Sequence, residues 1–339
     1  MKHPFSVCIT TAALLALGTH PLHAGLFTLS SVSLNALGTA GFDSQSSFSG
    51  ATSTTLSVSG RSLFPIDEHT LIEKGTGTST ASARTGAGTL GVQTAVTVHS
   101  TGSTALLSAK AGAFRNPGAG QNFDANGAQA EFSSSDLRVT PITGAGVSGA
   151  GTITAALRLN LDGSFVSNPA VGGPGTASFS TKLFLNVRFG FVDPVTHFQG
   201  GAFFAGAVGL SQTLGGPAVF DAGSGLLAGY QGGPLPLSVS VGSLPVGVPI
   251  DLQVRLGTIT EVTAAGDVEF SGGADFYHTL SLPTSGAVLT LPAGYTADSA
   301  ELNVSGNSFV AVPEPATWSV VAAAGLAGFA VLRRRRSQG

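Results

Sequence analysis

Acidic side chains that could bind a cation or act as acid and base occur in short clusters along the 339-residue chain. Asp124, Asn126 and Glu131 supply oxygen ligands around Gly127, as in a calcium-binding loop, but they span too few residues for the full pattern. A polar loop tip is the simpler interpretation, with a calcium site as the alternative.

Paired carboxylates for glycoside cleavage are a second possibility for the acidic residues. Asp267 and Glu269 are two residues apart, so on a strand they share one face. Such pairs meet only in the fold, and 17 acidic residues between positions 25 and 312 make accidental pairs common. Glycoside hydrolysis therefore stays the enzymatic alternative to a protein without catalytic activity.

Other catalytic chemistry lacks its sequence patterns. The chain has one cysteine, Cys8, so neither an internal disulfide nor a zinc site with paired thiolates can form. Gly144–Gly149 matches the dinucleotide-binding GxGxxG string, but a strand pattern follows where a helix would have to hold the pyrophosphate. The histidines have no HxH or HExxH spacing, and no G-x-S-x-G motif joins a strand to a helix. We expect no enzyme activity, no metal and no cofactor.

The charge of the chain changes when its ends are set aside. Residues 25–312 contain 10 basic and 17 acidic residues, a net charge of −7, whereas the whole chain has −3. An acidic body disfavours nucleic acid as a partner, because its binding needs clustered basic residues.

Alternating hydrophobic residues indicate an all-β body. Leu183, Leu185, Val187 and Phe189 alternate with more polar neighbours, which is typical of a strand with one buried face. Asp162-Gly163 has the composition of a two-residue hairpin turn. The pattern predicts strands at 28–36, 54–59, 89–99, 103–114, 136–142, 151–161, 163–168, 176–192, 197–212, 235–241, 249–263 and 266–281.

Strands at this spacing predict an antiparallel β-sandwich or jelly roll over residues 25–311. The length allows one large sandwich or two small ones, and the absence of a linker favours one. The stretches 38–60 and 75–88 are rich in Ser, Thr and Gly and are expected to be loosely ordered loops.

The first 24 residues have the features of a secretory signal peptide. Lys2 is the positive start, an apolar stretch follows from Val7 to Leu17, and cleavage is expected between Ala24 and Gly25. Cleavage would remove Cys8 together with the only methionine.

Residues 312–339 combine a short motif, an apolar segment and a basic cluster. Pro313-Glu314-Pro315 precedes Trp318, and the uncharged residues 319–332 are followed by four arginines: Arg333, Arg334, Arg335 and Arg336. From Pro315 to Leu332 a helix would extend about 27 Å, close to the thickness of a hydrocarbon core. We expect a single transmembrane helix with Trp318 at the outer interface, the arginines in the cytoplasm and a small-residue face at Gly325 and Gly328.

This C-terminal arrangement resembles the PEP-CTERM sorting signal of exopolysaccharide-producing Gram-negative bacteria. The resemblance covers about residues 312–336 and implies processing by an exosortase, a membrane protease or transpeptidase for which Pro313, Glu314 and Pro315 are substrate. A looser similarity to stretches that precede such signals covers residues 273–296. The resemblance implies an exported protein that is anchored in the inner membrane for a time and then reaches the cell surface or the extracellular space.

Three hypotheses for the body follow. The favoured one is a non-enzymatic envelope or extracellular matrix protein, as found in biofilms. The alternative is a carbohydrate-binding or carbohydrate-active sandwich that acts on the exopolysaccharide. A third is self-association through edges rich in Gly, Ala and Thr.

Overall fold

The computed structural model describes most of the chain between its two ends. The described residues are 27–36, 39–47, 52–65, 71–86, 88–111, 128–170, 173–192 and 199–310. All regular structure in them is β-strand and every strand pair is antiparallel, so the all-β prediction is confirmed. The predicted signal peptide and the predicted transmembrane helix lie outside the described residues.

Eighteen strands are described, and sixteen of them belong to one sheet. Their bounds are β1 (Phe27–Ala36), β2 (Thr39–Ser47), β3 (Thr52–Pro65), β4 (Leu71–Gly86), β5 (Thr89–Ala111), β6 (Ala128–Pro141), β7 (Thr152–Leu161), β8 (Ser164–Ala170), β9 (Gly175–Val192), β10 (Gln199–Thr213), β11 (Val219–Phe220), β12 (Ser224–Gly225), β13 (Leu235–Pro245), β14 (Ile250–Ser281), β15 (Leu289–Thr290), β16 (Tyr295–Asp298), β17 (Val304–Ser305) and β18 (Ser308–Phe309).

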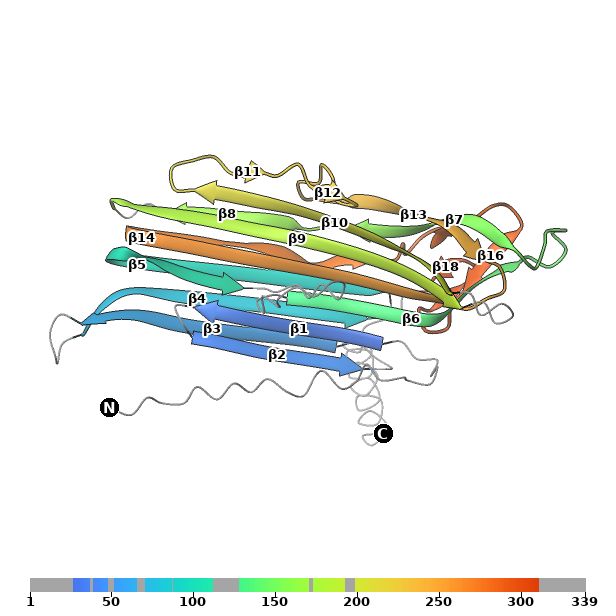
Figure 1. Ribbon diagram of the computed structural model, residues 1–339, viewed down its shortest axis with the longest axis horizontal. Coiled ribbons are helices and arrows are strands. Elements are labelled where there is room, and N and C mark those ends of the chain that lie inside the picture. Colours follow the sequence, from blue (N-terminus) through green and yellow to red (C-terminus); the bar gives the residue numbers. More distant parts are fainter. Residues whose placement is uncertain are drawn as a thin grey trace, which may run out of the picture.

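The 32-residue strand β14 is the centre of the fold (Figure 1). On one side it pairs with β9 over residues 250–266 and with β8 over residues 269–275. On the other side it pairs with β6 and then with β5. The strands β4 and β3 extend the sheet beyond β5, and β10 extends it beyond β9.

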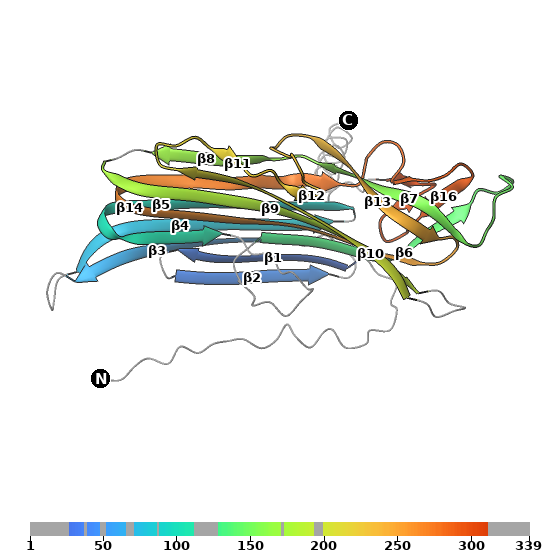
Figure 2. The ribbon, with the colours of Figure 1, turned by 45° about the horizontal axis from the view of Figure 1, so that its top comes forward.

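The sheet folds back on itself, so its two halves face each other. Phe179 is the register partner of Val262 in β14, yet its ring stacks on that of Phe270 with the ring centroids 6.1 Å apart. In a straight strand, eight residues would separate Val262 and Phe270 by roughly 26 Å. β14 therefore reverses its direction between these two residues, and the halves form the layers of a sandwich (Figure 2).

Glycines allow the reversal of the strands at this end. Gly266 in β14 has φ of 88° and Gly102 in β5 has φ of 58°, both in the left-handed region that favours glycine. The N–H of Gly102 donates to Oδ1 of Asp267 over 2.5 Å, which ties the two bends together. Pairing of β14 with β5 is irregular between Ala264 and Val268 for the same reason.

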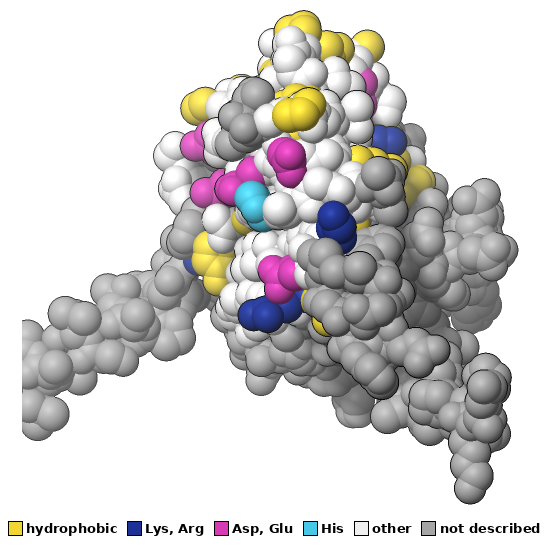
Figure 3. Space-filling model, turned by 90° about the vertical axis from the view of Figure 1, so that its left-hand side faces the viewer, with side chains coloured by type: hydrophobic (Ala, Val, Ile, Leu, Met, Phe, Trp, Pro, Cys, Tyr) yellow, Lys and Arg dark blue, Asp and Glu magenta, His cyan; other side chains and the backbone are white. Residues whose placement is uncertain are grey.

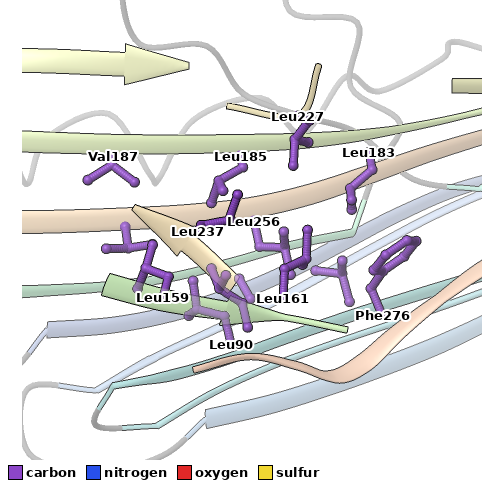
Figure 4. Close-up of a cluster of buried hydrophobic side chains, with 14 of the residues drawn as sticks. Leu90, Leu159, Leu161, Leu183, Leu185, Val187, Leu227, Leu237, Leu256 and Phe276 are labelled. Carbon is purple, nitrogen blue, oxygen red and sulfur yellow. The ribbon is translucent and has the colours of Figure 1, made fainter. Parts of the chain in front are cut away.

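Hydrophobic side chains from both layers fill the space between them and form one core cluster. In β9 every second residue from Ala177 to Phe189 is buried, as the alternation in the sequence predicted. Towards one end the core receives leucines from β7 and β13 in addition to those of the two layers (Figure 4). The side chains labelled there are Leu90, Leu159, Leu161, Leu183, Leu185, Val187, Leu227, Leu237, Leu256 and Phe276.

The predicted hairpin at Asp162-Gly163 is wrong. β7 and β8 do not pair with each other; Leu161 is the register partner of Leu280 and Ser164 of Asp275, so the chain continues in one direction along β14. Gly163 is needed for close packing, because a Cβ there would lie 2.3 Å from Cδ1 of Phe276.

The expected loops at 38–60 and 75–88 also differ from the structure, which places β2, β3 and most of β4 there. In β4 the inward positions carry small residues, including Gly77, Ser79, Ala81 and Ala83, which are all buried. Small inward residues conceal the alternation of a strand, because hydropathy distinguishes them poorly from their Ser and Thr neighbours.

Candidate functional site

The residue that precedes the C-terminal motif is attached to the folded body. Val310 donates its N–H to the carbonyl of Asn303 over 2.9 Å, and the side chain of Phe309 is buried beside Gly88. Asn307, with φ of 62°, accepts a hydrogen bond at Oδ1 from the N–H of Leu289 and donates from Nδ2 to the carbonyl of the same residue. The body therefore extends to the last residue before the motif.

Two carboxylates hold the turn at residues 299–302 against β6. Asp136 accepts hydrogen bonds from Oγ of Ser134 over 2.9 Å, from the hydroxyl of Ser299 and from the N–H of Glu301 over 3.1 Å. Glu301 in turn accepts a bond of 2.7 Å from the N–H of Ser135. Both carboxylates are thus occupied by hydrogen-bond donors of neighbouring residues, which fits a role in anchoring the turn.

Asp251, the second residue of β14, is a carboxylate whose pKa is shifted by its surroundings. Burial raises the pKa of Asp251, the positive charge of Arg188 opposes this, and the negative charge of Glu301 adds to it. A raised pKa can mark a functional carboxylate. Asp251 nevertheless stays accessible to solvent at a surface position of β14.

Glu131, the part of the proposed calcium loop that the structure describes, forms a buried ion pair. Its side chain is 4% exposed, and Oε2 lies 2.7 Å from Nε of Arg255, although the N–H is not aligned for a hydrogen bond. Oε1 accepts hydrogen bonds from Nη2 of Arg255 over 3.3 Å and from Nε2 of Gln253 over 2.5 Å. The carboxylate charge is thus already balanced by protein groups.

The calcium hypothesis itself stays a prediction. Asp124 and Asn126 lie outside the described residues. Among the residues that the structure does describe, no group of three His, Cys, Asp or Glu side chains is placed to hold a metal ion.

Asp267 and Glu269 are both exposed on β14, but each has a structural partner. Asp267 caps the N–H of Gly102, and Oε2 of Glu269 lies 3.5 Å from Nδ1 of His99. Figure 3 shows this end of the molecule, where acidic side chains gather beside a histidine. The pair therefore stabilises the bend and its surroundings.

The stretch 273–296 completes the second layer and then leads towards the C-terminal motif. The pairing of β14 with β5 is irregular between Phe276 and Leu280, and Tyr277 lies in this irregular part. Cζ of Arg84 is 5.0 Å from the centroid of the Tyr277 ring, and Nε of Arg84 donates to the Tyr277 carbonyl over 2.6 Å. Further on, the carbonyl of Gly294, at φ of 89°, accepts from the N–H of Ile142 over 2.8 Å. These contacts are structural and assign no chemistry to the stretch.

The remaining predicted site residues are outside the described part of the chain. They are the cleavage residues Ala24 and Gly25, the motif residues Pro313, Glu314 and Pro315, and the anchor residues Trp318, Gly325, Gly328, Arg333, Arg334, Arg335 and Arg336. Within the described ranges the structure contains no helix with the length and hydropathy to cross a bilayer.

The described body ends at Val310, and the C-terminal segment follows it directly. Residues 311–336 match the family model described as the PEP-CTERM protein-sorting motif. No curated protein and no solved structure matches the chain. The chain therefore carries a PEP-CTERM sorting motif, which implies export, a transient membrane-anchored state and sorting by an exosortase.

Proposed function

We propose that this protein is a non-enzymatic component of the cell envelope or extracellular matrix in an exopolysaccharide-producing Gram-negative bacterium. The sorting motif at residues 311–336 is the observation that carries the proposal. The state of the carboxylates supports it: Glu131, Asp136, Glu301 and Asp267 are each engaged in contacts that hold parts of the body together.

In this proposal the signal peptide is cleaved after Ala24 and the anchor holds the body outside the inner membrane, with the arginine cluster in the cytoplasm. The exosortase then recognises Pro313-Glu314-Pro315 and removes the anchor. Proline supplies no N–H donor and keeps the chain extended, so the triplet suits the cleft of a protease.

The experiment follows the body and the C-terminus with separate epitope tags. One epitope tag is inserted at Gly215, in the turn after β10 where a Cβ would meet nothing, and a second tag follows Gly339. We expect the C-terminal tag to be lost and the body to leave the membrane fraction only when the exosortase is present. Replacement of Pro313, Glu314 and Pro315 by alanine has the same effect as loss of the exosortase, whereas Ser305→Ala, at an exposed hairpin position, changes nothing. Equal processing without the exosortase refutes the proposal.

Binding of exopolysaccharide is a second candidate function, because hydroxyl side chains gather in the middle of one outer face of the sandwich. A single register row crosses five strands with only polar side chains: Ser59, Thr78, Thr97, Ser271 and Asn168. On the same face, the next register pair of β3 and β4 is Ser57 with Thr80, and both residues are exposed. Closely spaced hydroxyl groups can exchange hydrogen bonds with the hydroxyl groups of a neutral polysaccharide.

Purified processed protein and the host polysaccharide test this candidate. Thr78→Ala with Thr80→Ala, on the outer face of β4, is expected to weaken binding, and Ser180→Ala with Ser211→Ala, on exposed positions of the other layer, is not. If both pairs bind equally or the native protein does not bind, polysaccharide recognition by this face is refuted.

A further inference from the structure

Most long strands that lack a neighbouring strand on one side carry a feature that hinders pairing with another molecule. β3 contains Arg61, Pro65 and an irregularity between Ser62 and Leu63. β8 contains Pro169, and β13 contains Pro236 and an irregularity between Ser240 and Gly242. Proline, charge and bulges are the common protections of edge strands, because unpaired N–H and C=O groups otherwise attract a further strand.

The first half of β10 has none of these protections. Residues 199–205 read Gln-Gly-Gly-Ala-Phe-Phe-Ala, without charge and without proline. One side of β10 pairs with β9 in an unbroken register. On the other side β12 pairs at Gly206 and Ala207 and β11 at Leu210 and Ser211, whereas the described residues contain no strand partner for 199–205.

The backbone of this segment points hydrogen-bonding groups to the open side. The carbonyls of Ala205 and Gly209 accept hydrogen bonds from Leu226 and Asp221, which lie on that side. Since backbone groups alternate along a strand, Gly201 and Phe203 direct their N–H and C=O groups to the same side. The side chain of Phe203 is 58% exposed, an unusual position for a large apolar group in such a strand.

We infer that the β10 segments 199–205 of two copies of this chain pair in antiparallel fashion and form a closed two-fold dimer. A two-fold axis presents the same groups from both copies, so Gly201 and Phe203 of each copy find donors and acceptors in the other. The body carries a net charge of −7, and the uncharged segment is where two acidic bodies approach with little repulsion.

The protected edges make the assembly a dimer and not a filament. A filament needs a second, different edge that accepts β10, but β3, β8 and β13 each carry proline or an irregularity, and β2, whose only described strand partner is β1, contains the charged residue Asp43. In the dimer the layer that contains β9 and β14 continues from one molecule into the next. The inference goes beyond the proposed function, because it holds whether or not an exosortase processes the chain.

The test is the size of the protein in solution. Phe203→Lys places a charge on the open edge at an exposed position, and Leu106→Lys places the same charge at a 64% exposed position of β5. By sedimentation velocity at micromolar concentration, we expect dimers for the native protein and for Leu106→Lys, and monomers for Phe203→Lys. A native monomer, a Phe203→Lys dimer or an open series of larger species overturns the inference.

A cross-linking experiment guards against a folding defect in the lysine variant. Ala202→Cys is expected to form a disulfide between two copies under oxidation, because antiparallel pairing of the 199–205 segments places Ala202 opposite Ala202 of the other copy on the two-fold axis. Leu106→Cys is the matched control and is expected to stay monomeric. Equal cross-linking of both variants also overturns the inference, and circular dichroism verifies that each variant retains its β structure.

Discussion

The hydroxyl groups of Thr94 and Thr260 lie 2.7 Å apart and join the two layers of the folded sheet. Thr94 is the register partner of Ala274, whereas Thr260 pairs with Thr181, so the contact crosses the sandwich. Thr181 lies within 2.8 Å of Thr260 as well and donates to the carbonyl of Ile259. A small polar network is thus enclosed in an otherwise apolar core, and its hydroxyl groups satisfy one another.

Removal of both the Thr94 and Thr260 hydroxyl groups is expected to lower the stability by less than the sum of the two separate removals. Thr260→Val leaves the buried Thr94 hydroxyl without its partner and should lower the free energy of unfolding by about 1–3 kcal/mol. In the double variant Thr94→Val with Thr260→Val no orphaned hydroxyl remains at Thr94, so the total loss should be smaller than the sum of the single losses. Urea denaturation of the four proteins measures the coupling, and strictly additive losses would contradict the role of the contact.

The ion pair between Arg255 and Glu131 leads to a second prediction, in which the single variant is less stable than the double variant. Arg255→Met leaves a buried carboxylate without its positive partner and should lower the free energy of unfolding by about 3–5 kcal/mol. Arg255→Met combined with Glu131→Met removes the uncompensated charge and should recover much of this loss. If the double variant is no more stable than Arg255→Met in thermal denaturation, the pair does not balance the charge as described.

Gly163 and Gly190 form a matched pair for testing close packing. Gly163→Ala brings a Cβ into Phe276 and the carbonyl of Asp275, and the loss should be roughly 1–3 kcal/mol. Gly190→Ala places its Cβ 3.7 Å from that of Asp251, an ordinary contact, and should be neutral or slightly stabilising. Comparable losses for both variants in urea denaturation would show that space at Gly163 is not limiting.

The buried Tyr230 is expected to make the folded protein less stable at alkaline pH. Burial, and secondarily the charge of Asp162, raise the pKa of Tyr230 from 10.0 to about 12, while its hydroxyl donates to the carbonyl of Gly233. Between these pH values the unfolded chain releases the tyrosine proton and the folded chain keeps it, so stability falls as the pH rises from 10 to 12. Tyr230→Phe should show a shallower decline of melting temperature over this range. An identical decline in both proteins would refute the link to Tyr230.

Alternation of hydropathy predicted the strands where the buried residues are large. β9 and the first part of β14 follow their patterns because Leu, Val and Phe mark the inward side. β4 was not predicted because its inward positions are Gly, Ser and Ala. The predicted strand ends at 99/103 and 263/266 fall at the bend, but the pattern indicated separate strands, whereas β5 and β14 each continue through the bend as one strand. The reversal depends on glycines that also occur at many straight positions, so composition alone could not locate it.

The contacts of the polar clusters could not be predicted for a different reason. Glu131 and Arg255 are 124 residues apart, and Ser299 and Asp136 are 163 apart; both pairs exist only because of the strand register. No local pattern encodes such a register. The sorting motif, in contrast, lies within one short segment, and its recognition from Pro313, Glu314, Pro315 and the arginine cluster agrees with the family match at 311–336.

The late position of β14 in the chain determines the order of folding. Both of its neighbours, β5 with β6 on one side and β9 on the other, are synthesised before it, and its contact with Thr94 closes a loop of 166 residues. Neither layer can gain its central strand until residues 250–281 have crossed the inner membrane, which makes folding dependent on long-range pairing and therefore slow. The sorting motif begins only thirty residues after Ser281, so little chain separates the end of the central strand from the segment that directs sorting.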